Sequence, residues 1–146
     1  MKLRVTVADQ RRYLEWSAPI CGTPRWPDDT EAVAIVDETD AIRGVMLLNL
    51  RQNDSCMVHF ASDGSRRWAT RKTLEWLFGY LFLYKRMTRV CAVTSVHNIE
   101  TIVSVVRLGF QFEGRQRAGS MDGSDAIMLG MLASDCRWIK PEDHHG

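Results

Sequence analysis

The sequence lacks a long apolar run, and it lacks the signal of an exported protein. Its longest apolar stretch, residues 76–84, has nine residues, about half of what a transmembrane helix needs. Residues 1–7 alternate between polar and apolar side chains, whereas a signal peptide has a continuous apolar segment. We therefore expect a cytoplasmic protein that has no membrane partner.

Paired cysteines are also missing. The four cysteines at positions 21, 56, 91 and 136 are scattered, with no C-x-x-C pair and no zinc-like spacing. Most of them have apolar neighbours, which is typical of small buried side chains. The histidines at positions 59, 97, 144 and 145 do not have the spacing of a metal site either. We expect no disulfide framework, no metal cofactor and a reducing compartment.

An excess of charge of one sign is absent as well. The chain has 19 Lys and Arg residues and 18 Asp and Glu residues, which gives a net charge of +1 at pH 7. This balance gives no electrostatic argument for nucleic acid or acidic lipid as a partner. The densest basic cluster consists of Arg66, Arg67, Arg71 and Lys72. It fits the solvated start of a helix, or a surface that faces the phosphates of a cofactor or of nucleic acid.

What the chain does have is the composition of an ordinary globular domain. Of its 146 residues, 45% are hydrophobic and 25% are charged, which excludes a disordered tail or a low-complexity linker. A length near 150 residues favours one domain. We predict a single domain over residues 1–139 and a polar C-terminal tail over residues 140–146.

Residue periodicity predicts one helix and four strands in the first half of the chain. Strands are expected at residues 2–7, 32–36, 42–50 and 56–61, and Asp9 suits the N-cap of a helix that runs to about residue 16. Residues 18–29 contain three of the four prolines, so a loop is expected there. Short polar turns link the last three strands, and these strands should therefore pair in antiparallel fashion.

The second half predicts two helices and three strands. Helical spacing extends from residue 69 to residue 84, a strand follows at 89–94, and Asn98 suits the N-cap of a helix that ends at Gly109. A hairpin is expected from residues 110–117 and 125–133. The order is β-α-βββ-α-β-α-ββ. It predicts an α+β fold with a central mixed, mostly antiparallel sheet flanked by helices.

A loop of small residues joins the strand at 56–61 to the next helix. Backbone N–H groups and the positive end of a helix converge at such a step, and phosphate is the group that suits this point best. Arg66 and Arg67 would add charged donors to the phosphate oxygens. A phosphate site and a plain connection both fit the loop when it is taken alone.

This loop, together with a second pattern, resembles the GNAT superfamily of acyl-CoA-dependent N-acyltransferases. The expected strand order is the order of that fold. Asn98-x-x-Thr101, Leu108-Gly109-Phe110 and Glu113-Gly114-Arg115 are similar to segments of the branch that acetylates ribosomal proteins and other protein N-termini. Trp68-Ala69-Thr70 is similar to the Tyr-Ala-Thr that opens the phosphate-side helix of the superfamily. Residues 128–138 also resemble the endings of GNAT-like proteins that tailed bacteriophages encode.

The resemblance implies a site for acetyl-CoA between two splayed strands. The strand at 59–62 would bind the pantetheine arm, and its N–H groups would polarise the thioester carbonyl as an oxyanion hole does. The amine would attack the bound thioester directly, so no nucleophilic cysteine is needed. The cofactor-binding residues that the resemblance implies are Phe60, Ala61, Ser62, Ser65, Arg66, Arg67, Trp68, Ala69, Thr70, Asn98 and Thr101.

Two features depart from the pattern of the superfamily. Arg67 stands at the position of the central glycine of the phosphate loop, and Ser65 at the glycine-like position before it. Glycine lets the backbone approach the pyrophosphate, so the Arg67 side chain either folds over the phosphates or blocks them. Many members also have a tyrosine that protonates the leaving thiolate. This chain has Val105 there, so the proton comes either from the neighbouring Ser104 or from water.

The sequence offers more than one candidate for the general base of the reaction. An ammonium substrate must lose a proton before it attacks, and a group that titrates near neutrality suits this task. His59, on the strand beside the expected cofactor, is the best candidate, although a packed strand histidine fits the same position. Glu113 is an alternative base and fits equally a hairpin surface charge, whereas His97 fits a loop residue.

Three functions follow from these observations. The first is transfer of an acetyl group from acetyl-CoA to an amine, which is a protein N-terminus or a small amine. The alternative is a catalytically degenerate GNAT-like structural or adaptor protein, a component of a bacteriophage virion with other virion proteins as partners. Its location would be the cytoplasm of the bacterial host or the virion. Modification of a nucleic acid through the basic cluster is the least favoured of the three.

Overall fold

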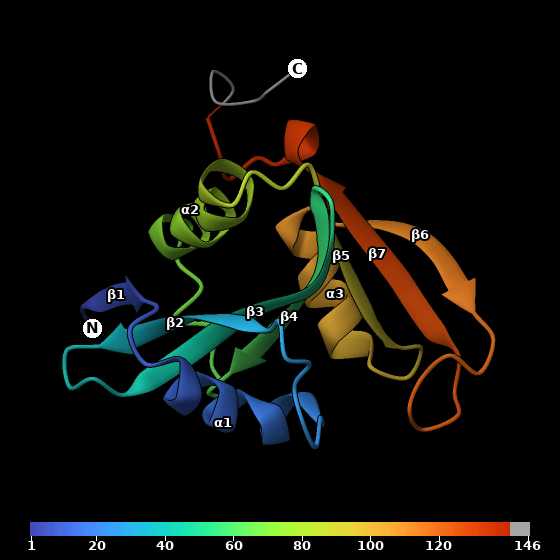
Figure 1. The fold of residues 1–146 in the computed structure, drawn as a ribbon, viewed down its shortest axis with the longest axis horizontal. Helices are drawn as coiled ribbons and strands as arrows, with labels where there is room; N and C mark the ends of the chain where they lie inside the picture. The colour runs from blue at the N-terminus through green and yellow to red at the C-terminus, as the bar shows by residue number, and fades with distance from the viewer. Residues whose placement is uncertain (141–146) are drawn as a thin grey trace.

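The computed structural model describes residues 1–140. Figure 1 shows its strands and helices along the chain. Their bounds are β1 (Leu3–Thr6), α1 (Gln10–Cys21), β2 (Glu31–Asp37), β3 (Ile42–Gln52), β4 (Ser55–Ser62), α2 (Arg71–Gly79), a π-helical turn η1 (Tyr80–Tyr84), β5 (Arg89–Ser95), α3 (Ile99–Leu108), β6 (Gln111–Gln116), β7 (Ala126–Leu132) and a 3-10 turn η2 (Ala133–Asp135). The predicted order of strands and helices is confirmed. The tail predicted at residues 140–146 lies, apart from Lys140, outside the described residues.

Helix α1 is longer than the sequence predicts. Asp9 caps its start by accepting a hydrogen bond from the backbone N–H of Arg12 at 3.3 Å. The helix then continues through Pro19 and ends at Gly22, which has the left-handed φ of +69°. Proline has no N–H group, so it removes one backbone hydrogen bond of a helix. Pro19 lies in the last turn of α1, which ends at Cys21, so the loss affects only the end of the helix. The loop predicted from residue 18 therefore begins after Cys21.

The helix predicted up to residue 84 changes its winding on the way. Regular α-helix ends at Gly79, and Tyr80–Tyr84 form the π-helical turn. Thr70 caps the start of α2, since its hydroxyl accepts a hydrogen bond from the N–H of Thr73 at 3.1 Å. The helix thus begins at Arg71, two residues after the predicted start.

Within the described residues, seven strands form one sheet in the order β1-β2-β3-β4-β5-β7-β6. β1, β2, β3 and β4 pair in antiparallel fashion, as the short turns between the last three predict. β4 and β5 are parallel. β7 pairs with β5 on one side and with β6 on the other. The last strand of the chain therefore lies inside the sheet, between two strands that precede it in the sequence.

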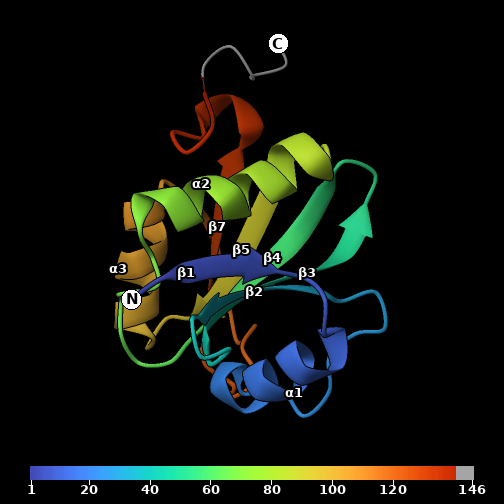
Figure 2. The ribbon, with the colours of Figure 1, turned by 90° about the vertical axis from the view of Figure 1, so that its left-hand side faces the viewer.

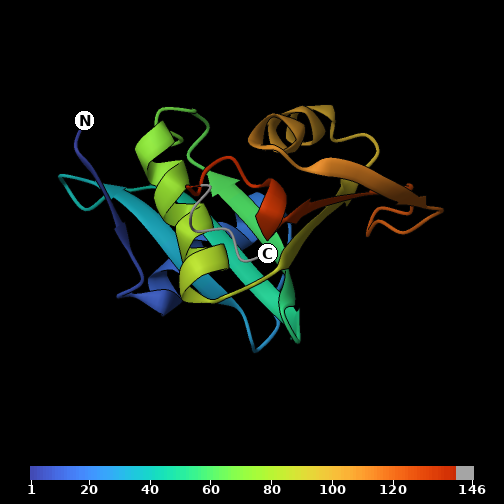
Figure 3. The same ribbon diagram turned by 90° about the horizontal axis from the view of Figure 1, so that it is seen from above.

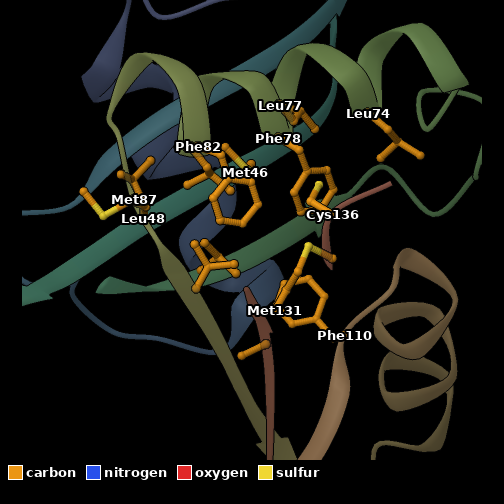
Figure 4. Packing of buried hydrophobic residues seen from close by; sticks show 14 of the residues in the cluster. Met46, Leu48, Leu74, Leu77, Phe78, Phe82, Met87, Phe110, Met131 and Cys136 are labelled. Atoms are coloured by element: carbon orange, nitrogen blue, oxygen red, sulfur yellow. The ribbon is translucent and has the colours of Figure 1, made fainter. Parts of the chain in front are cut away.

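Helices cover both faces of the sheet. Figure 2 shows α1 on one side of the strands and α2 on the other, and Figure 3 shows α2 and α3 on the same side, over different strands. The larger apolar core lies beneath α2 and α3, and Figure 4 shows Phe78 and Phe82 of α2 and η1 in it, together with Met46 and Phe110. The smaller core lies beneath α1. Its buried members are Tyr13, Ala32, Ala34, Val36, Ile42, Val45, Leu47 and Ala61.

The alternation of the central strands explains this division. Along β2, Val33 and Ile35 belong to the larger core, and Ala34 and Val36 belong to the smaller one. Successive side chains of a strand point to opposite faces, so a continuous apolar run fits a strand that is covered on both sides. No helix in residues 1–140 is long and apolar enough to cross a membrane.

Candidate functional site

The two strands at the centre of the sheet separate after a short parallel pairing. They pair only over Ser55 to Met57 of β4 and Arg89 to Cys91 of β5. Beyond this junction the halves of the sheet diverge, as Figure 1 shows for β4 and β5. Backbone N–H and C=O groups of the diverging segments are therefore not used in a ladder between these two strands.

A cleft of about 590 Å³ opens at this divergence. The end of α1, the second half of β4, the loop after β4, the second half of β5 and α3 contribute to its walls. Ten of the thirteen residues that the sequence predicts for the site line it, namely His59, Phe60, Ser62, Ser65, Arg66, Trp68, Ala69, Asn98, Thr101 and Ser104. The structure thus brings together predicted residues that are up to 45 positions apart in the sequence, from His59 to Ser104.

Three of the predicted residues do not line the cleft. Ala61 is completely buried in the core beneath α1. Arg67 is exposed, and its side chain does not border the cleft. Thr70 uses its hydroxyl to cap α2. These three side chains thus lie outside the lining of the cleft, and their part in cofactor binding stays a prediction.

The loop after β4 is held by its own side chains. The Ser62 hydroxyl donates to the carbonyl oxygen of Ser65 at 2.8 Å and accepts from the N–H of Gly64 at 3.1 Å. The Asp63 carboxylate accepts from both the N–H and the hydroxyl of Ser65, at 2.9 Å each. Several N–H groups that the sequence assigns to phosphate therefore already have partners. Arg66 is the basic side chain of this loop that borders the cleft.

An ion-pair network ties the same loop to the turn between β2 and β3. Arg43 bridges Asp37, which is 3% exposed, and Asp63, at N–O distances of 2.7 and 3.4 Å. Burial opposes ionisation of Asp63, but its hydrogen bonds with Ser65 and its pairing with Arg43 lower the pKa of this carboxyl. Asp63 is therefore held as a carboxylate, and it fixes the conformation of the loop.

Trp68 anchors the end of the loop in the core. Its ring is 7% exposed, and its indole N–H donates to the Ser62 hydroxyl at 3.1 Å. The ring lies against Gly44 of β3, where a Cβ atom would be 2.5 Å from Cδ2 of the indole. The position that resembles the Tyr-Ala-Thr of the GNAT superfamily is thus a structural anchor as well as a wall of the cleft.

Helix α3 contributes Asn98, Thr101 and Ser104 to the cleft at a spacing of three residues. Asn98 holds the predicted N-cap position of α3, but its side chain makes no capping hydrogen bond. Its amide instead donates to the hydroxyl of Thr94 at 3.1 Å, which links the start of α3 to β5. Glu100 and Arg107 also line this wall. A polar wall from α3 thus faces the cleft.

His59 lies on β4 and lines the cleft. Its Nε2 atom is 3.3 Å from Oδ1 of Asn49, and its ring centroid is 5.3 Å from that of Trp26. Burial lowers the pKa of the imidazole below its ordinary value near 6.5. At neutral pH the side chain is therefore uncharged and able to accept a proton.

Two cleft residues come from the end of α1, which the sequence analysis missed. Ile20 is 47% exposed, and the Cys21 thiol lies 3.9 Å from the carbonyl oxygen of Phe60. Burial raises the pKa of this thiol to about 11. Pro19 led to the prediction of a loop here. Gly22 is typical of the residue that follows a helix, and it could have indicated that the helix extends to Cys21.

Glu113, the alternative base, lies elsewhere. Its carboxylate forms a two-pronged ion pair with the guanidinium of Arg89, with one contact of 2.8 Å, and lies over Gly130. This pairing lowers the pKa of Glu113, and the side chain does not line the cleft. Glu113 is therefore engaged by Arg89 outside the cleft, which favours His59 as the candidate base. Among residues 1–140, no group of three or more His, Cys, Asp or Glu side chains is arranged to hold a metal ion.

Comparisons with known proteins find likeness in structure. No family model matches the chain, and no curated protein matches it in sequence. The spermidine/spermine N-acetyltransferase SpeG from Vibrio cholerae, solved in complex with manganese ions, has a TM-score of 0.74 at 14% identity over 91% of this chain and 94% of that chain. Mutant forms of the same enzyme give 0.74 at 12% identity, over 91% and 96%. A chimera of this enzyme and hSSAT gives 0.72 at 12% identity, over 90% and 96%.

Identities this low show the fold alone. The three neighbours give no support to the narrower likenesses to bacteriophage proteins or to the branch that acetylates protein N-termini, which stay predictions. The expected α+β architecture is confirmed. With its sheet of seven strands and its parted central pair, the described chain has the fold of the GNAT superfamily of N-acyltransferases.

Proposed function

We propose that this protein is an N-acetyltransferase that transfers the acetyl group of acetyl-CoA directly to an amine. The observation that carries the proposal is the cleft between β4 and β5, where the parallel pairing stops at Met57 and Cys91. Unpaired strand backbone, the loop before α2 and the polar wall of α3 surround this single space. Fold alone does not establish an activity, so the proposal depends on these groups and their chemistry.

The cleft offers separate groups for the two ends of acetyl-CoA. Strand edges bind extended ligands through backbone hydrogen bonds, so the free edge of β4 suits the pantetheine arm and its N–H groups suit the thioester oxygen. Arg66 lines the cleft in the loop that leads to α2, and its guanidinium suits the pyrophosphate. Asn98 at the N-cap of α3 and Thr101 within α3 complete the opposite wall.

The proposed reaction needs one proton acceptor and one proton donor. The amine nitrogen attacks the thioester carbonyl carbon, a C–N bond forms, and the C–S bond breaks. Neutral His59 takes the proton that the amine loses, and the Ser104 hydroxyl or a water molecule gives a proton to the departing thiolate. No acyl-enzyme forms, which agrees with the raised pKa of the Cys21 thiol in the same cleft.

The charges of the cleft favour an acceptor with a single amino group. Among the described residues that line it, the charged side chains are Arg66, Arg107 and Glu100. A polyamine carries several positive charges and needs several carboxylates to bind it. The neighbours named above act on spermidine and spermine, and this cleft has one carboxylate to offer such a substrate. Ile20 and Cys21 instead give an apolar border beside His59.

The test measures acetyl-CoA binding by titration calorimetry and thiol release from acetyl-CoA in the presence of amines. The panel contains spermidine, 2-phenylethylamine and a short peptide with a free N-terminus. We expect micromolar binding of acetyl-CoA and higher kcat/KM with the two singly charged amines than with spermidine. Absence of binding at millimolar acetyl-CoA would overturn the proposal and favour the structural or adaptor role.

A pair of variants tests the roles of the two candidate bases. We expect His59→Gln to lower kcat about 100-fold, within the usual range for loss of a general base. Glu113→Gln is the matched control, because its carboxylate pairs with Arg89 away from the cleft. Its kcat should stay within about twofold of the wild type. An equal loss in both variants would contradict the assignment of His59.

A further inference from the structure

Asn49 is a buried polar side chain in an apolar part of β3. It is 1% exposed, and the two residues before it, Leu47 and Leu48, are buried in the cores on opposite faces of the sheet. A buried amide needs hydrogen-bond partners at both of its ends. Asn49 has one partner at each end, because Nδ2 donates to the Thr30 hydroxyl at 3.2 Å and Oδ1 faces Nε2 of His59 at 3.3 Å.

This arrangement sets the tautomer of His59. An amide oxygen only accepts hydrogen bonds, so the His59 Nε2 atom that faces it carries the proton. In a neutral imidazole the other nitrogen then keeps its lone pair. Trp26 packs against the same ring and donates its own indole N–H to the carbonyl oxygen of Leu14 at 3.1 Å. The orientation of the His59 ring is therefore fixed by neighbours on two sides.

The second nitrogen of His59, Nδ1, makes no hydrogen bond within the described residues. Oε2 of Glu31 is the one buried side-chain nitrogen or oxygen atom within residues 1–140 that lacks a hydrogen-bond partner. Nδ1 of His59 has no partner within these residues and is not such a fully buried atom, so the protein does not enclose it completely. His59 lines the cleft, and the inference below requires that its unprotonated nitrogen meets a substrate there.

We infer that Asn49, itself held by Thr30, is a positioning residue that keeps His59 protonated at Nε2, so that Nδ1 is free to take the proton of the attacking amine. The inference rests on the proposed function, because it assigns Nδ1 a task in acetyl transfer. Asn49 touches no substrate in this scheme and acts through His59. A leucine would fill the same space but would leave the imidazole without its acceptor.

The charged groups around His59 do not oppose a neutral imidazole that is protonated at Nε2. The titratable groups that share its cleft are Cys21 from α1, Arg66 from the loop, and Glu100 and Arg107 from α3. Asn49 and Thr30 bring no charge, and Trp26 brings none. Burial is the cause that lowers the pKa of His59, and no charged neighbour offsets it. A carboxylate at position 49 would therefore be a new charge beside the ring.

Nitrogen-15 NMR of the full chain measures the tautomer directly, without acetyl-CoA or an amine. At pH 7.5 we expect His59 to be protonated at Nε2 and unprotonated at Nδ1, and His59→Gln identifies its signals. In Asn49→Leu the Nδ1-protonated form should become populated. A wild-type imidazole that carries its proton on Nδ1 would overturn the inference.

Kinetics with the best amine of the panel separate positioning from a merely structural role. Asn49→Leu should lower kcat at least about tenfold, a part of what a general base contributes, with an unchanged KM for acetyl-CoA. Asn49→Asp should restore most of kcat and raise the pKa of His59, since an adjacent negative charge favours the imidazolium. The acid limb of the kcat profile should therefore move to higher pH. An acid limb at the same pH in Asn49→Asp and the wild type would count against the inference.

Thr23→Val is the matched control for Thr30→Val. Thr23 lies in the same loop region and bonds the carbonyl oxygen of Arg25 at 2.9 Å, away from His59. We expect Thr30→Val to populate the second tautomer and Thr23→Val to behave as the wild type. Nε2-protonated His59 in a protein without any acetyl transfer would overturn the proposed function and leave the positioning of His59 by Asn49 standing. Equal tautomer populations in the two threonine variants would remove Thr30 from the arrangement.

Discussion

The indole ring of Trp68 covers Gly44 so closely that no side chain fits beneath it. A Cβ atom at Gly44 would lie 2.5 Å from Cδ2, 2.8 Å from Cε2 and 2.8 Å from Cε3 of the ring. Glycine is thus required on β3 so that the loop after β4 can be pinned to the sheet. The contact connects a strand of the scaffold to the wall of the cleft, and the same indole holds Ser62 through its N–H group.

Gly44→Ala should therefore destabilise the protein and disturb the cleft together. Overpacking of this kind costs about 1–3 kcal/mol, and the displaced Trp68 should weaken acetyl-CoA binding. Urea unfolding and titration calorimetry measure the two effects. Gly114→Ala is the control, because a Cβ atom there meets nothing within 4 Å. A Gly44→Ala protein as stable as this control would show that Trp68 does not pin the loop.

The two adjacent arginines of the loop should differ in their effect on acetyl-CoA binding. Arg66 lines the cleft and Arg67 does not. We expect Arg66→Ala to raise the Kd for acetyl-CoA about tenfold, which corresponds to about 1.4 kcal/mol, and Arg67→Ala to leave it within about twofold. Calorimetry at low and at moderate salt measures both. The reverse order of effects would mean that Arg67 folds over the phosphates after all.

Asp37 should make the stability of the fold depend on acid. Its hydrogen bond from Thr39, together with those from Arg43 and Ala41, holds the pKa of this carboxyl far below its usual range. Because the unfolded value is about 3.9, the ionised group stabilises the fold above that pH, and its contribution is lost as the pH falls toward the folded value. The advantage over Asp37→Asn should be full at pH 7 and shrink below about pH 4.

Thermal unfolding from pH 3 to pH 7 tests this dependence. At pH 7 we expect Asp37→Asn to melt roughly 5 °C below the wild type, a size typical of a lost buried network in a chain of this length. Asp28→Asn is the control, since the Asp28 side chain is 93% exposed. A gap between wild type and Asp37→Asn that stays constant across this range would contradict the role of the ionised carboxyl.

Cys21 should react slowly with alkylating agents although it borders the cleft. Its thiol has a pKa raised to about 11 by burial, and the thiolate is the reactive form. Labelling by iodoacetamide, followed by mass spectrometry of the peptide that contains Cys21, should therefore accelerate about tenfold per pH unit between pH 7 and pH 9. A rate that levels off near pH 8.5 would indicate an ordinary thiol. Acetyl-CoA should leave no acetyl group on this peptide.

The sequence predicts the strands and the loop of the site because their signals are local. Alternation and β-branched runs reveal the strands, and the small residues before Thr70 reveal the loop. Helix α1 was predicted too short because Pro19 is a strong local breaker, although a proline in a last turn removes a single hydrogen bond. For the same reason, the sequence did not predict that Ile20 and Cys21 border the cleft.

Other features were out of reach because they depend on packing. Asn49 is an isolated polar residue in an apolar strand, and only the register of β3 against β4 brings it to His59. Pairing across the sheet likewise takes Glu113 to Arg89 and away from the cleft. Asn98 looks like a helix cap in the sequence, but Thr94 on β5 offers its amide a partner that only the fold supplies.

The place of β7 has a consequence for the way this chain is made. Among the strands that the structure describes, β5 and β6 meet only through β7, and β7 is the last of these to leave the ribosome. Until residue 132 has emerged, β5 has no neighbour along its second half, and one wall of the cleft has no support. Domains generally fold as units, and pairings between distant segments form late. The nascent protein therefore acquires its cleft in one late step, and a chain cut short before β7 keeps β5 joined to β4 over three residues and leaves β6 without a strand partner.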